Sequence, residues 1–159
     1  MDKETLEKIR RISEKFFGTQ SDPDQMPVNQ ESADKLHAIH PDTIIYKFDG
    51  PRNPIAWSVV VPTSIGVMNG FLNKEISEKE LLDMATEEKK FEALYLCAVF
   101  VLPEYRGKGY AKQLLTESID KLSKGKVLPL YCWIYSKEGA GLINLLSQEL
   151  GREIARRND

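Results

Sequence analysis

The alternation of apolar and polar residues predicts a series of helices and strands. Apolar residues recur at helical spacing over residues 2–17, and Gly18 follows as a stop, so we expect an amphipathic helix there. A polar, proline-containing stretch over 19–30 indicates a linker or lid. A second short helix is expected over 31–39, because Pro41 disfavours its continuation.

The next segment combines strand and helix signals. Two β-rich runs, 43–48 and 55–61, flank a stretch of Gly, Asn and Pro, which predicts an antiparallel hairpin. A glycine-containing loop is expected to follow. Ser77 and Glu80 then form a capping-box pattern, which predicts a helix over 77–89.

The second half of the chain alternates between strands and helices. Residues 93–102 are apolar apart from one tyrosine hydroxyl, as is typical of a strand covered on both faces. Helical spacing resumes from Ala111 to Leu122, and Gly125 ends it. A strand over 127–135 and a helix over 137–150 follow. A mixed α/β fold is therefore expected.

The last predicted helix has a start signal and an apolar face. Ser136 is a candidate N-cap because its hydroxyl can accept a hydrogen bond from a backbone N–H of the first turn. The helix is expected to bury Leu142, Leu145, Leu146 and Leu150.

Composition narrows the class of protein. A length of 159 residues predicts one domain, 1–159, in which 1–40 form a helical N-terminal segment. The net charge of −2 argues against a nucleic-acid binder. No apolar run is long enough to span a membrane and the N-terminus does not resemble a secretory signal, so we expect a cytoplasmic protein. Cys97 and Cys132 lie in apolar runs, which predicts core positions and no metal site.

The loop after the central strand has the composition of an anion site. In LPEYRGKGYAKQLL, Arg106 precedes Gly107 and Gly109 directly before a predicted helix. The N-terminus of a helix presents free N–H groups to a phosphate, and the glycines allow close approach. A dinucleotide fingerprint would need glycine where the chain has Lys112, and no GxxxxGK[ST] string occurs.

The wider string resembles the acyl-CoA signature of the GNAT superfamily, R/Q-x-x-G-x-G/A. Arg106, Gly109 and Ala111 match the signature, and Val101 and Pro103 match the turn before it. The resemblance covers roughly residues 92–150. It implies a GNAT-like mixed sheet flanked by helices, with this segment as the acyl-CoA-binding core.

The resemblance also implies how acetyl-CoA is held as co-substrate, with no metal. Backbone N–H groups of the loop would bind the pyrophosphate, and the strand before it would pair with the pantetheine arm. The positions concerned are Val99, Phe100, Val101, Arg106, Gly107, Lys108, Gly109, Tyr110 and Ala111.

The acceptor side matches the family less well. The resemblance implies that an amine attacks the thioester directly, which requires the amine to be neutral. Deprotonating an ammonium of pKa near 10.4 at pH 7 costs about 4.6 kcal/mol. Glu92 is the best-placed acidic candidate for a base, and His37 and His40 are weaker ones. Members of the family often protonate the departing thiolate with a tyrosine in the last helix, but the matching position here is Ser147. Tyr135 is then the candidate for a substitute acid.

The C-terminus departs from the family pattern, and the sequence does not specify the acceptor. Most members of the family continue into two more strands, whereas the polar residues after Gly151 predict none, so a shortened C-terminus is expected. The N-terminal helices, the segment 62–90 or a partner in a homodimer would then wall the acceptor site. We expect an N-acetyltransferase acting on a small-molecule or protein amine. A non-catalytic acyl-CoA-binding or sensing module and an interaction domain are the alternatives.

Overall fold

The structure, a computed structural model, describes residues 3–17, 30–51, 53–134 and 136–157. Five strands form one sheet in the order β1-β2-β3-β4-β5. They are β1 (Ile44–Phe48), β2 (Pro54–Thr63), β3 (Ala93–Val101), β4 (Leu130–Trp133) and β5 (Ile154–Arg157). The first three strands pair antiparallel, and β3, β4 and β5 pair parallel. The predicted mixed α/β fold is confirmed.

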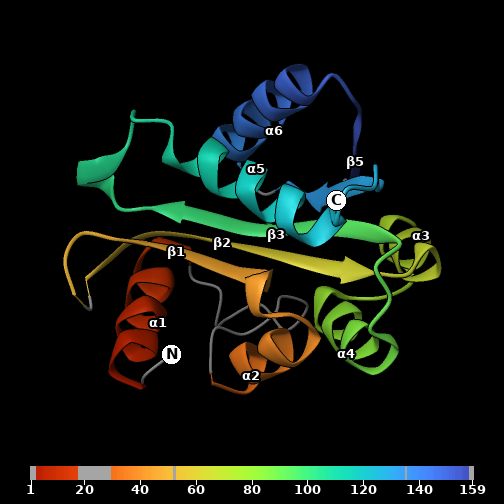
Figure 1. Ribbon diagram of the computed structural model, residues 1–159, viewed down its shortest axis with the longest axis horizontal. Helices are drawn as coiled ribbons and strands as arrows, with labels where there is room; N and C mark the ends of the chain where they lie inside the picture. Colours follow the sequence, from red (N-terminus) through yellow and green to blue (C-terminus); the bar gives the residue numbers. More distant parts are fainter. Residues whose placement is uncertain (1–2, 18–29, 52, 135, 158–159) are drawn as a thin grey trace.

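Helices cover both faces of this sheet (Figure 1). They are α1 (Lys3–Phe17), α2 (Gln30–Ile39), α3 (Ile65–Leu72), α4 (Glu78–Glu88), α5 (Tyr110–Ser123) and α6 (Lys137–Leu150). Two short 3-10 turns, η2 (Pro41–Thr43) and η3 (Pro103–Tyr105), precede β1 and α5. In Figure 1, α5 and α6 lie above the sheet, and α1, α2 and α4 lie below it.

Apolar clusters fill the space between the sheet and each helical layer. The cluster on the side of α2, α3 and α4 includes Leu36, Phe71, Leu82, Tyr95 and Tyr131, and the one under α5 and α6 includes Leu94, Leu115, Leu130 and Leu146. Neighbouring residues of β3 and β4 therefore point to opposite faces, as the period of a strand requires. A smaller cluster of Ile9, Trp57 and Phe100 seats α1 on the same face as α4, nearer the end of β3.

The segment between β2 and β3 is more helical than the sequence analysis predicts. The capping box at α4 is confirmed, since Ser77 accepts from the N–H of Glu80 and the Glu80 side chain accepts from the N–H of Ser77. The glycine-containing loop expected before it is wrong, because that stretch forms α3. The Ser64 hydroxyl caps α3 by accepting from the N–H of Val67, and burial of one helical face offsets the glycines inside the helix.

Three expectations for the C-terminal third are corrected. The strand expected over 127–135 is shorter, and Val127 is 82% exposed. Leu145, expected in the core, is 45% exposed, whereas Ile143 is buried. A strand does follow α6. The polar sequence of this strand shows no alternation of apolar residues, because one of its buried residues is an arginine. The guanidinium of Arg157 lies 4.6 Å from the ring centroids of both Phe71 and Trp133.

Candidate active site

The central strand β3 is interrupted by a bulge at Cys97. Val60 on β2 pairs with Leu96, but the preceding residue, Val59, pairs with Ala98, so Cys97 is an extra residue on β3. A bulge bends its strand and redirects side chains, and bulges are common beside active sites. Here it turns both Cys97 and Ala98 toward the face covered by α4, where Cys97 contacts α4 and Val59 packs into the α4 cluster.

Beyond the bulge, β3 loses its parallel neighbour. The last paired positions are Leu96 on β3 and Cys132 on β4. β3 runs on to Val101, whereas β4 ends at Trp133. Within the described residues, residues 98–101 therefore pair with β2 alone, and the other edge of β3 is open over 97–101. Open strand edges carry unpaired backbone N–H and C=O groups that can pair with an extended ligand.

The loop that follows has the geometry of an anion site. Gly107 and Gly109 adopt φ values of 82° and 80°, in the left-handed region that favours glycine. Gly109 is the N-cap of α5, and no side chain caps that helix end. An added Cβ at Gly107 would meet no atom within 4 Å. Residues 106–109 are exposed, so the first turn of α5 can receive a phosphate.

Contacts with the β1–β2 turn fix the position of this loop. The Tyr105 hydroxyl donates to the carboxylate of Asp49 at 2.6 Å, and this contact together with partial burial raises the pKa of Tyr105. The ammonium of Lys108 lies 5.6 Å from the centre of the Tyr105 ring. At the start of α5, the ring of Tyr110 lies 4.6 Å from the ammonium of Lys47 on β1. The loop is thus held at its edges while its backbone stays accessible.

Several of the predicted ligand-binding residues have side chains that are buried or turned back onto the protein. The guanidinium of Arg106 turns back, with Nε donating to the carbonyl of Val101 at 3.0 Å and Cζ 5.7 Å from the centre of the Phe100 ring. Phe100 and Val101 bury their side chains, and Ala111 is partly buried. These residues can therefore contribute backbone groups, and Arg106 holds the loop against the strand.

Residues 81–141 match the family model described as an acetyltransferase (GNAT) domain. The match identifies this segment as a GNAT acetyltransferase domain. The matched segment runs from α4 through β3, the glycine loop, α5 and β4 into α6, which includes the whole candidate donor site. No curated protein and no solved structure matches the chain.

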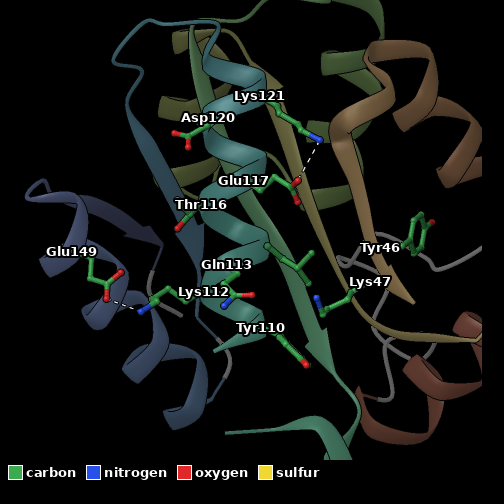
Figure 2. Close-up of a pocket in the computed structure, with 11 residues that line it drawn as sticks. Tyr46, Lys47, Tyr110, Lys112, Gln113, Thr116, Glu117, Asp120, Lys121 and Glu149 are labelled. Carbon is green, nitrogen blue, oxygen red and sulfur yellow. Dashed lines mark hydrogen bonds and ion pairs between the residues drawn. The ribbon is translucent and has the colours of Figure 1, made fainter. Parts of the chain in front are cut away.

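A shallow depression of about 700 Å³ lies along α5 on this GNAT domain (Figure 2). Its lining is mostly charged, and opposite charges lie together: Lys112 is 2.6 Å from Glu149, and Lys121 is 3.4 Å from Glu117. It lies along α5, on the opposite side of the sheet from the bulge. The depression therefore offers neither an unbalanced charge nor access to Cys97.

The two predicted proton-transfer residues have different outcomes. Glu92 is exposed, and its Oε1 accepts from the backbone N–H of Ile65 at 3.1 Å, so it caps the first turn of α3. It lies five residues before Cys97, about 16 Å along an extended strand, and its catalytic role stays a prediction. Tyr135 lies outside the described residues. Nδ1 of His40 accepts from the N–H of Asp42 at 3.0 Å, a structural contact.

Sequence reasoning missed a buried acidic group beside the bulge. Glu78, at the start of α4, is 4% exposed. One of its oxygens, Oε2, accepts from the Tyr95 hydroxyl and lies 3.7 Å from Sγ of Cys97. Burial and the neighbouring Glu78 carboxylate raise the pKa of the Cys97 thiol well above its ordinary value. Only the capping pattern pointed to this region, because no local motif links Glu78 to β3.

Two further findings hold for the described residues. None of their helices combines the length and apolar composition that crossing a membrane requires. No three His, Cys, Asp or Glu side chains in those ranges gather as a metal site would require.

Proposed function

We propose that this GNAT protein transfers an acetyl group from acetyl-CoA to the primary amine of a small molecule or protein. The observation that carries the proposal is the adjacency of two features: the open edge of β3 over residues 97–101, and the glycine loop at the start of α5. Pantetheine pairing along the first and pyrophosphate binding at the second would place the thioester beside the bulge.

The residues present fit this donor. The pyrophosphate would be held by backbone N–H groups of residues 107–111, where the positive φ of Gly107 and Gly109 leaves the backbone accessible. The pantetheine arm would pair with the backbone of Val99 and Phe100. Acetyl-CoA supplies an activated acyl carbon, and the protein supplies its orientation.

Direct attack by the amine is the mechanism that the site favours. The amine nitrogen forms a bond to the thioester carbon, the C–S bond breaks, and the departing sulfur takes a proton to become the thiol of CoA. An acyl-cysteine route would need a thiolate at Cys97, and the raised pKa of Cys97 keeps that group protonated at neutral pH.

Thermal unfolding with and without acetyl-CoA tests donor binding. Ligand at 100 times its dissociation constant should stabilise the fold by about 2.7 kcal/mol. Release of CoA thiol in the presence of primary amines then tests transfer. A stabilised protein that releases no thiol with any amine would instead be an acyl-CoA-binding module, and absence of stabilisation would refute the donor site.

A further inference from the structure

Glu78 is the only carboxylate side chain that is buried among the described residues of this protein. It is the first residue of α4, directly after the N-cap Ser77. Removing a carboxylate from water is costly unless other groups compensate for the lost hydration. Neighbouring groups must therefore compensate for the hydration that the Glu78 carboxylate has lost.

The partners of Glu78 bracket the point where β3 and β4 separate. The Tyr95 hydroxyl donates to Oε2 of Glu78, and Tyr95 is fully buried on the paired part of β3. The Cys97 thiol, 3.7 Å from the same oxygen, lies at the bulge where pairing has ended. The carboxylate is thus held next to the start of the open edge.

Immediately after Cys97, the strand is accessible from the α4 side. Ala98 is exposed although it lies on the central strand of the sheet. It separates the α4 cluster, which contains Tyr95, from the α1 cluster, which contains Phe100. An acceptor can therefore approach β3 at Ala98, one residue from the thiol that contacts Glu78.

We propose that Glu78 is the group that takes the proton from the acceptor's ammonium before attack on the thioester. This inference rests on the proposed transferase function and assigns a residue to it. The ammonium gives one proton to the carboxylate, directly or through one water. The neutral nitrogen then bonds to the acyl carbon, its second proton leaves with the CoA thiol, and Glu78 returns its proton to solvent.

Polar and charged groups on the neighbouring elements make the following contacts. Tyr95 and Cys97 face it from β3, and Tyr131 of β4 binds Thr63 through its hydroxyl at 2.7 Å. Arg157 of β5 donates to the carbonyl of Ile76, two residues before Glu78. Lys35 of α2 pairs at 2.7 Å with Asp83 on the exposed side of α4, and Lys74 lies in the exposed turn before α4.

Glu78 also lies outside the segment that matches the GNAT family model, which begins at residue 81. The residue comes from the helical segment between β2 and β3. Glu92 competes for the same role, but its side chain holds α3 about 16 Å along the strand from the bulge. Burial and proximity to the open edge both favour Glu78.

The test compares Glu78→Gln with Glu87→Gln, an exposed residue on the same helix. Thiol release is measured with acetyl-CoA and three probe amines, ethanolamine, spermidine and a lysine peptide, from about pH 6 to about pH 10. We expect Glu78→Gln to lower kcat by roughly 10²- to 10⁴-fold at neutral pH with an unchanged Kd for acetyl-CoA. The loss should shrink as pH approaches the amine's own pKa of about 10.4.

The outcomes separate this inference from the proposed function. Wild-type protein that binds acetyl-CoA but acetylates none of the probes overturns both. If the wild type is active, a Glu78→Gln rate within about threefold of Glu87→Gln, or a loss equal at every pH, overturns only the role of Glu78.

A second variant covers the case in which Glu78→Gln does not fold. Tyr95→Phe keeps the packed ring and removes the hydroxyl that favours the charged carboxylate. We expect the acidic limb of its pH–rate profile to move to higher pH. An unchanged limb in folded Tyr95→Phe protein would refute the proposal.

Discussion

Replacing Gly109 by aspartate tests the donor site, and Gly125 provides a matched control. Both glycines are exposed, with φ values of 80° and 81°. A Cβ at Gly109 would lie 3.9 Å from Nε2 of Gln113, an ordinary contact, and one at Gly125 would meet no atom within 4 Å. Gly109 precedes α5 and Gly125 follows it, so only the first lies where the pyrophosphate is expected.

The two variants should lose similar stability but differ in binding. A side chain at positive φ costs about 1–2 kcal/mol, which for a chain of this size lowers Tm by about 2–8 °C. Unit charges about 4 Å apart in water repel by about 1 kcal/mol, so a diphosphate facing the aspartate of Gly109→Asp loses about 2 kcal/mol, or roughly 30-fold in Kd. The new carboxylate also competes for the same N–H groups.

Calorimetric titration with CoA measures the Kd of each variant, and thermal unfolding without ligand measures the shared strain. We expect Gly125→Asp to bind CoA like the wild type and Gly109→Asp to bind at least about 30-fold more weakly. Equal Kd values for the two variants would show that the loop does not bind the pyrophosphate.

Three other predictions concern the scaffold. The hydroxyls of Ser58 and Ser118 share a buried hydrogen bond of 2.9 Å, so Ser118→Ala should lower the free energy of unfolding by about 1–3 kcal/mol and the double alanine variant by less than the sum of the single changes, as measured in urea. Ser77→Ala removes the N-cap of α4 and should lower the same quantity by about 0.5–2 kcal/mol; an unchanged urea midpoint would contradict the cap. Burial raises the pKa of Cys132 from 9.0 to about 11. The neutral thiol therefore contributes stability that is complete below about pH 9 and is lost, by about 2–3 kcal/mol, as pH rises to about 11. Cys132→Ala should flatten the resulting fall of Tm with pH.

The local structure of the proposed donor site was predictable because its determinants are consecutive. The apolar run over 93–102, the glycines of the loop and the helical spacing after them each specify a local conformation. β3, the left-handed glycines and α5 follow in that order in the structure. Arg106 departs from the expectation, because its backbone N–H, expected to bind the pyrophosphate, donates to the carbonyl of Pro103 at 3.3 Å.

The missed elements depend on contacts that sequence spacing does not encode. α3 contains two glycines, yet Phe71 is completely buried and the helix start is held by Ser64 and Glu92. β5 ends in Arg157, which looks solvent-exposed in the sequence but packs over Phe71 and Trp133. In both cases tertiary packing overrides a weak local preference.

The same distinction explains why a donor can be proposed from the sequence and an acceptor cannot. Pyrophosphate recognition uses backbone groups that one loop presents, so a short string suffices to indicate it. The carboxylate proposed to take the amine's proton lies 17 residues before Tyr95 and 19 before Cys97, and only the packing of α4 on β3 brings them together. If Glu78 serves that role, acceptor chemistry in this protein depends on the helical segment between β2 and β3. Changes in α3 and α4 should then alter amine preference and kcat while leaving CoA affinity unchanged.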